Sequence, residues 1–221
     1  MNATSPNNDG QTFESLDPRT GKVIAHFPVH SESYVHGEVD RALLAAPLWQ
    51  ALGFEGREEI LRAWSKDILH HSHELSSLVA EETGKPLSDA TLEVTLAIEQ
   101  LSWAAKNAQK YLSDSKRASG ILMFNMKSKV QRVPFGTVGV IGPWNYPVFT
   151  PMGSIAYALA AGNTVVFKPS EYTPAVGVWL EESFKRVTPF PHIFSVVTGK
   201  GETGAALTTS RVSKISFTGS T

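Results

Sequence analysis

Apolar residues recur at helical spacing through the first half of the chain. Between residues 33 and 52, for example, they fall on Val39, Ala42, Ala46 and Trp49, three or four positions apart. This spacing brings apolar side chains to one face of a helix. The pattern predicts helices at residues 33–52, 55–69, 73–82 and 88–112, the last with Leu92, Leu96, Glu99, Trp103 and Tyr111 along it. A short strand is expected before them, at residues 22–29.

A different pattern follows residue 136, where short apolar runs alternate with helical segments. Strands are predicted at residues 138–141, 164–167, 193–197 and 214–217, and helices at residues 149–159, 175–187 and 203–209. Alternation of strands and helices is typical of a doubly wound parallel sheet with right-handed crossovers. Between the two halves, residues 120–124 and 127–133 around Asn125 predict a β-hairpin.

These patterns divide the chain into four parts. We expect a disordered tail at residues 1–12, a helical amino-terminal part at 13–116, a hairpin at 117–135 and a Rossmann-like core at 136–221. The predicted fold class is therefore α/β, with a helical prelude and a hairpin followed by a doubly wound parallel sheet.

Composition narrows the class of protein. The chain has 221 residues, of which 42% are hydrophobic and 19% charged, as is usual for a folded globular protein. Twenty basic residues against 21 acidic ones give a net charge of −1, so nothing in the overall charge attracts nucleic acid. The absence of cysteine excludes disulfides, thiolate metal sites and a thiol nucleophile within these residues.

One uncharged segment raises the question of a membrane span. Residues 133–167 contain no Asp, Glu, Lys, Arg or His, and about 20 apolar residues suffice to cross a bilayer. Four prolines and five glycines within the segment are incompatible with an uninterrupted helix, so we expect buried strands around an apolar helix instead. Residues 1–12 are polar and lack the apolar core of a secretory signal, so a cytoplasmic location is expected.

Polar residues follow two of the predicted strands. Asn145 lies between Pro143 and Pro147 beyond the first strand of the sheet, and Lys168 and Glu171 follow the second. In an open α/β sheet, ligands bind at the carboxyl ends of the strands. A lysine and a glutamate placed there can bind ribose hydroxyls, although such a pair on a surface is usually only solvated. Asn145 could likewise be only a turn residue.

Five short motifs, in order along the chain, resemble the aldehyde dehydrogenase superfamily. They are Asp17-Pro18-Arg19-Thr20-Gly21, Glu82-Thr83-Gly84-Lys85-Pro86, Pro143-Trp144-Asn145-Tyr146-Pro147, Asn163-Thr164-Val165 and the segment from Lys168 to Glu171. The likeness extends from residue 17 to residue 221. It implies NAD(P)-dependent oxidation of a small-molecule aldehyde to a carboxylic acid, by an enzyme that forms a homo-oligomer.

The resemblance also implies roles for individual residues. Asn145 would stabilise the oxyanion that forms when a thiolate adds to the aldehyde, and the hairpin would serve oligomerisation. The implied cofactor-binding residues are Ile141, Gly142, Pro143, Trp144, Lys168, Ser170, Glu171, Gly201, Thr218, Gly219 and Ser220. Gly219 and Ser220 would face the diphosphate at the start of a helix. Trp144 would form a wall of the cofactor cleft, or else pack in the core.

The carboxylate at position 171 favours one cofactor over the other. In the resemblance, Glu171 accepts a hydrogen bond from the 2′-hydroxyl of the adenosine ribose, and it would repel a 2′-phosphate. NAD is therefore the expected cofactor. NADP is the alternative, because the nearby Lys168 could tolerate the phosphate.

The segment from Gly199 to Gly204 matches the dinucleotide fingerprint GxGxxG. It belongs to the third strand–helix unit rather than the first, and the acidic partner expected about 20 positions later would fall past residue 221. The resemblance makes it a wall beside the adenosine, and a tight turn is the equally weighted alternative. No metal site is predicted, because His70, His71 and His73 cannot converge on one ion from a single helix.

By the same resemblance, the family's nucleophilic cysteine and general-base glutamate lie beyond residue 221. We therefore expect the amino-terminal part of such an enzyme, inactive alone, that holds most of the cofactor site. The alternative is a short non-catalytic protein that binds a nucleotide or a partner.

Overall fold

A four-stranded parallel sheet lies at the centre of the structure, a computed structural model that describes residues 10–219. Its strands, in spatial order, are β7 (Phe194–Val196), β6 (Thr164–Lys168), β5 (Thr137–Ile141) and β8 (Lys214–Phe217). Val165, Val166 and Phe167 of β6 are almost completely buried, as expected for a strand covered on both faces. Every neighbouring pair is parallel, which confirms the predicted sheet.

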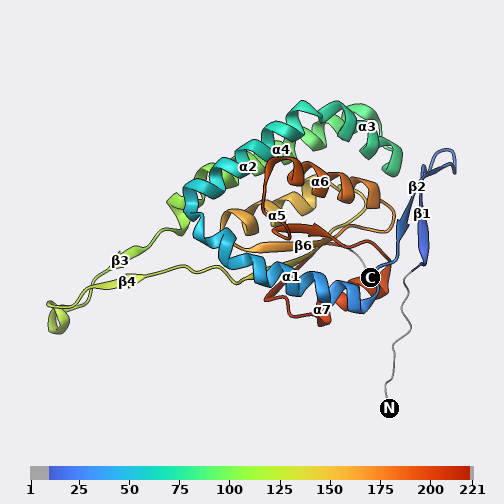
Figure 1. Cartoon of the computed structure of the whole chain (residues 1–221). Coiled ribbons are helices and arrows are strands. Elements are labelled where there is room, and N and C mark those ends of the chain that lie inside the picture. Colours follow the sequence, from blue (N-terminus) through green and yellow to red (C-terminus); the bar gives the residue numbers. More distant parts are fainter. Residues whose placement is uncertain (1–9, 220–221) are drawn as a thin grey trace, which may run out of the picture.

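Helices cover both faces of this sheet (Figure 1). One face carries α5 (Phe149–Ala160) and α6 (Pro174–Val187), and the other carries α1 (Glu32–Ala51) and α7 (Gly201–Thr209). An outer layer over α5 and α6 consists of α2 (Gly53–His70), α3 (Ser72–Thr83) and α4 (Leu87–Leu112). Each was predicted from the apolar periodicity, with ends within two residues. Within residues 10–219, no helix is long and apolar enough to cross a membrane.

The exposed and buried faces of α4 differ from those suggested by its large apolar residues. Its buried positions are mostly small: Ala90, Val94, Ala97, Leu101, Ala104 and Ala105. These small side chains let α4 lie close to α5. Leu92 is 60% exposed and Trp103 is 49% exposed, and the Trp103 ring stacks on Tyr111 at the surface. The predicted helix itself is confirmed, with Leu92 and Trp103 on its exposed face.

The main core lies between the sheet and the helices on the α5 side. Trp64 packs edge-on against Phe184, with 5.0 Å between ring centroids. The indole N–H groups of Trp49 and Trp64 donate to the carbonyl of Leu159 and to the hydroxyl of Ser183, at 2.9 and 3.1 Å. Buried tryptophans are stable in a core only when this polar group finds a partner, and here both do.

A long hairpin extends away from the rest of the chain (Figure 1). Its strands are β3 (Ser115–Arg117) and β4 (Ser128–Val130), which pair antiparallel. The strand predicted at residues 120–124 is wrong, because Gly120 has a φ of 81° and the chain turns into a 3₁₀ helix at Ile121–Met123. A left-handed residue at that point ends the extended conformation.

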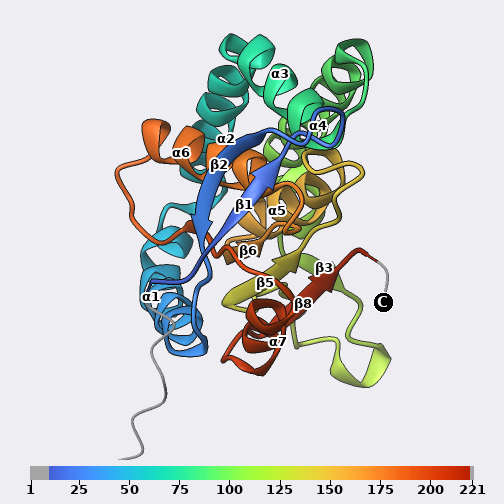
Figure 2. The same ribbon diagram turned by 90° about the vertical axis from the view of Figure 1, so that its right-hand side faces the viewer.

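A second antiparallel pair comes first in the chain. It consists of β1 (Thr12–Leu16), which the sequence patterns did not predict, and β2 (Val23–Pro28), which they did. Thr12 belongs to β1 rather than to the tail predicted at residues 1–12, and residues 1–9 lie outside the described part. Figure 2 faces this pair and shows β5 and β8 side by side, with α7 beside them.

Candidate functional site

The carboxyl ends of β5, β6 and β8 meet at one edge of the sheet. The chain moves from β5 through β6 to β7 in one direction, whereas β8 lies on the opposite side of β5. Such a reversal of strand order opens a crevice in which doubly wound proteins bind ligands. A cleft of about 800 Å³ occupies this position.

The cleft brings together all the predicted site residues that the structure describes. Asn145 and ten of the implied cofactor residues line it, namely Ile141, Gly142, Pro143, Trp144, Lys168, Ser170, Glu171, Gly201, Thr218 and Gly219. Ser220 lies outside the described residues. Trp144 is 55% exposed in this cleft, so the alternative of core packing is wrong.

The sequence patterns missed four residues that also line the cleft. Ala205 and Thr208 belong to α7, as does Gly204 of the fingerprint segment, whereas Tyr172 follows β6 and Phe217 ends β8. Together with Gly201, the three α7 residues are spaced as one helical face, at positions 201, 204, 205 and 208. That spacing of small residues was the available signal, because a helix that borders a ligand must leave room for it.

The end of β6 places a buried cation beside an accessible carboxylate. The Lys168 side chain is 5% exposed, and its Nζ donates to the carbonyl of Pro169 at 2.9 Å. Oε2 of Glu171 lies 3.8 Å from the same nitrogen, and the Glu171 side chain is 36% exposed. Burial lowers the pKa of Lys168, while the charges of Glu171 and Glu202 oppose this shift. The pair offers one donor and one acceptor to adjacent hydroxyl groups.

The three glycines of the segment at residues 199–204 have different functions. Gly199 has a φ of 149°, and a Cβ there would lie 2.0 Å from Oγ1 of Thr203, so the turn itself requires glycine. A Cβ on Gly201 would meet no protein atom within 4 Å, and Gly204 lies against the methylene groups of Lys168. Gly199 is therefore required by the turn, whereas Gly201 and Gly204 leave space in the cleft that a side chain would fill.

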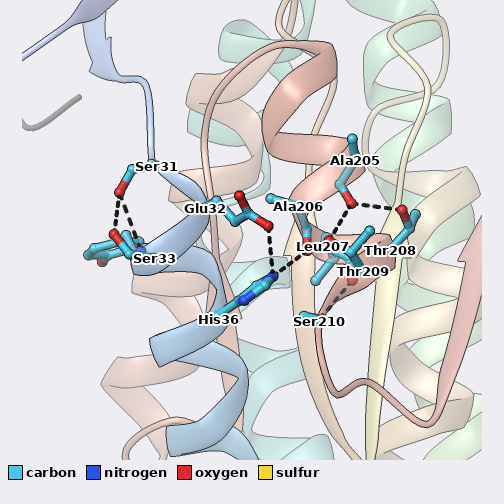
Figure 3. Close-up of polar contacts among 11 residues, drawn as sticks. Ser31, Glu32, Ser33, His36, Ala205, Ala206, Leu207, Thr208, Thr209 and Ser210 are labelled. Carbon is cyan, nitrogen blue, oxygen red and sulfur yellow. Dashed lines mark hydrogen bonds and ion pairs between the residues drawn. The ribbon is translucent and has the colours of Figure 1, made fainter. Parts of the chain in front are cut away.

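The opposite face of α7 is fixed to α1 (Figure 3). Nε2 of His36 lies 3.1 Å from the carbonyl of Ala206 and 3.8 Å from the carboxylate of Glu32. Ser31 begins α1 by accepting a hydrogen bond from the backbone of Tyr34. The contact between His36 and Ala206 holds α7 against α1 while the small residues of α7 face the cleft.

Asn145 lies in the turn between β5 and α5, where its side chain is exposed at the cleft. Its Oδ1 accepts from the backbone N–H of Tyr146 at 3.0 Å. Within residues 10–219 the side-chain NH₂ group makes no hydrogen bond, so it remains available as a donor. Gly142 precedes this turn, and a Cβ there would lie 2.9 Å from the ring of Phe167.

The cleft suits a dinucleotide. Lys168 and Glu171 can bind the hydroxyls of a ribose, and the glycine-lined start of α7 allows a ligand to approach the backbone closely. Exposed aromatic rings of Trp144 and Tyr172 border the same space. A metal is a poorer match, because the described residues contain no cluster of three His, Asp or Glu side chains suited to an ion.

Comparison with known proteins identifies relatives of this chain. Glutarate-semialdehyde dehydrogenase of Pseudomonas putida is 34% identical over 215 residues, which cover 96% of this chain and 44% of the relative. Succinate-semialdehyde dehydrogenase (NADP(+)) GabD of Escherichia coli is 32% identical over 216 residues, with 97% and 44% covered. The NAD+ complex structure of an aldehyde dehydrogenase from Bacillus cereus superposes with a TM-score of 0.91 at 28% identity, covering 96% of this chain and 43% of that one.

The chain thus spans less than half the length of the relatives it matches. The model of the aldehyde dehydrogenase family matches residues 5–221, nearly the whole sequence. The motifs, the sheet and the cleft at its edge agree with this match, and the chain belongs to the aldehyde dehydrogenase family.

Proposed function

We propose that this chain is the cofactor-binding part of an NAD(P)-dependent enzyme that oxidises a small-molecule aldehyde to a carboxylic acid. The observation that carries the proposal is the cleft at the ends of β5, β6 and β8, which is lined by Asn145, Lys168 and Glu171 together. The cation and the carboxylate suit dinucleotide binding. The amide of Asn145, whose NH₂ group makes no hydrogen bond within residues 10–219, suits oxyanion stabilisation. When bound, the dinucleotide would accept the hydride of the aldehyde.

In this proposal Lys168 and Glu171 bind the adenosine ribose, and the face of α7 at Gly201 borders the adenosine. Glu171 would accept from the 2′-hydroxyl and would disfavour a 2′-phosphate, so NAD is the preferred cofactor and NADP the weaker one. The names of the relatives include both cofactors. Thr218, Gly219 and Ser220 are proposed for the diphosphate side, although Ser220 lies outside the described residues.

Asn145 is proposed as the oxyanion donor. Its NH₂ group, which makes no hydrogen bond within residues 10–219, can donate to the oxygen that gains charge when a thiolate attacks the carbonyl carbon. The thiol must come from polypeptide outside these residues, because the sequence contains no cysteine. The same observation supports a second candidate, a non-catalytic protein that binds a dinucleotide.

We also propose that the complete enzyme is a cytoplasmic homo-oligomer assembled through the β3–β4 hairpin. Its apolar tip supports this role, since Ile121, Leu122 and Phe124 are each at least 88% exposed. The balanced net charge gives no support to a nucleic-acid partner.

One experiment separates the enzyme from the non-catalytic binding protein. The 221-residue chain should form no NADH from any aldehyde, because it has no thiol to begin the reaction. Residues 1–221 are then joined to the part of the Pseudomonas putida relative that this chain does not match. The joined protein should oxidise an aldehyde, and Asn145→Ala should lower its kcat by about 100- to 1,000-fold with little change in NAD affinity. Normal turnover of the Asn145→Ala variant would exclude the proposed role of Asn145.

A further inference from the structure

The motif Glu82-Thr83-Gly84-Lys85-Pro86 lies outside the cleft, yet it contacts the turn that carries Asn145. Helix α3 ends at Gly84, whose φ of 73° reverses the chain, and a Cβ there would lie 3.0 Å from Pro18. The left-handed conformation favours glycine at this position. The reversal brings Lys85 towards the turn between β5 and α5.

Lys85 bridges a buried carboxylate and the backbone of Asn145. Its Nζ donates to Oε2 of Glu93 at 2.6 Å and to the main-chain carbonyl of Asn145 at 2.7 Å. The same ammonium lies 4.4 Å from the ring centroid of Tyr146. The Lys85 side chain is only 15% exposed, so water screens these contacts weakly.

Glu93 completes the connection from the other side. Its side chain is fully buried in α4, and its Oε1 accepts from the backbone N–H groups of Val148 and Phe149 at 2.8 and 3.2 Å. Those groups belong to the first turn of α5, where backbone N–H groups lack partners inside the helix. A carboxylate at a helix amino terminus is also favoured by the helix dipole. One ion pair therefore holds the turn at Asn145, in its middle, and at its end, where α5 begins.

We propose that Lys85 and Glu93 are positioning residues that fix the backbone of Asn145 so that its side-chain amide faces the reacting carbonyl oxygen. This inference rests on the proposed oxyanion role of Asn145. Helices α3 and α4 contribute no residue to the lining of the cleft. The Lys85–Glu93 ion pair would transmit the rigidity of these helices to the turn that carries Asn145. The pair touches neither the cofactor residues of β6 nor those of α7 in the described structure, so its loss should affect the turn more strongly than the ribose site of Lys168 and Glu171.

Nuclear magnetic resonance of the 221-residue chain tests this directly. The side-chain NH₂ signal of Asn145 is assigned by its loss in Asn145→Ala. Lys85→Met and Glu93→Gln should shift and broaden that signal and speed amide hydrogen exchange at Val148 by tenfold or more, because a charge-assisted hydrogen bond is lost. Lys85→Arg, which keeps the charge, should restore much of the parent signal. Lys106→Met, on the exposed face of α4, is the matched control.

The NAD dissociation constant is measured for the same proteins and should change far less than hydrogen exchange at Val148, because Lys168, Glu171 and α7 keep their contacts. Failure of the parent chain to bind NAD would count against the proposed function while leaving the signals of the turn as a separate readout. The positioning role is overturned if the Asn145 signal and Val148 exchange in Lys85→Met match those in Lys106→Met. If Glu93→Gln fails to fold, the two Lys85 variants decide the outcome.

Discussion

At the scale of single residues, Lys168 and Glu171 are the pair proposed to distinguish one dinucleotide from the other. Lys168 is nearly buried and keeps its charge close to the more accessible carboxylate of Glu171. The carboxylate suits a free 2′-hydroxyl, whereas the ammonium would suit a phosphate. We therefore propose that the preference for NAD or NADP is a balance between these two side chains, 3.8 Å apart.

Substitution of each member of this pair should shift that balance in a different direction. Glu171→Gln should weaken NAD binding about tenfold and improve binding of NADP relative to NAD, because repulsion of a phosphate disappears. Lys168→Ala should weaken both cofactors, and NADP more strongly. Calorimetric titration of the chain with each dinucleotide measures both effects, with Glu182→Gln on the exposed side of α6 as control. Constants within twofold of the parent for both variants would show that the pair is only solvated.

Most residues that line the cleft were predictable because they follow strands within a few positions. The ends of β5 and β6 are visible as apolar runs; Lys168 comes directly after one run, and Asn145 comes four positions after the other. Contacts between distant segments were not predictable in this way. Lys85 reaches Asn145 across 60 positions, and neither spacing nor composition indicates such a contact.

At the scale of elements, Glu82 joins three of them. Its buried carboxylate accepts from the Ser15 hydroxyl of β1 at 2.5 Å and from the first N–H groups of α6, at Ala175 and Val176, both at 2.9 Å. Burial raises the pKa of Glu82 from 4.5 to about 7, although these donors lower it. The folded chain then holds a proton that the unfolded chain releases at lower pH.

This difference predicts how stability depends on pH. Between pH 4.5 and about 7 the folded state binds more protons than the unfolded state, so the contribution of Glu82 to the free energy of unfolding falls as the pH rises. The loss is on the order of 3 kcal/mol. Glu82→Gln should remove this pH-dependent loss of stability, whereas Glu81→Gln, at the exposed neighbour, should leave the loss unchanged. Urea unfolding at several pH values measures this, and identical pH dependence in the parent and Glu82→Gln would contradict the assignment.

The β3–β4 hairpin is the element for which self-association is proposed. The triple substitution Ile121→Ser, Leu122→Ser and Phe124→Ser removes the apolar tip. It should convert an oligomer to a monomer, as measured by sedimentation velocity. Leu44→Ser removes an equally exposed apolar side chain of α1 and should leave the oligomer intact. An oligomer that survives the triple substitution would show that the tip is not the interface.

At the scale of the whole molecule, the sequence indicated the sheet and its helices but not how the first half is arranged around them. Periodicity is local, so it located α1 to α4 correctly along the chain. It could not show that α1 covers one face of the sheet while α2 to α4 lie over the other. The strand β1 escaped prediction for a similar reason, since it is defined by pairing with β2.

The cleft at the ends of β5, β6 and β8, bordered by α7, is proposed to bind a dinucleotide. Titration of the ¹⁵N-labelled chain with NAD, followed by nuclear magnetic resonance, tests it most directly. Binding of NAD in this cleft should cause saturable shifts of the backbone signals at Gly142 and Trp144, at Ser170 and Glu171, and at Gly201 and Ala205. Absence of saturable shifts, or shifts confined to the separate cavity lined by Phe27, Tyr34 and His192, would contradict it.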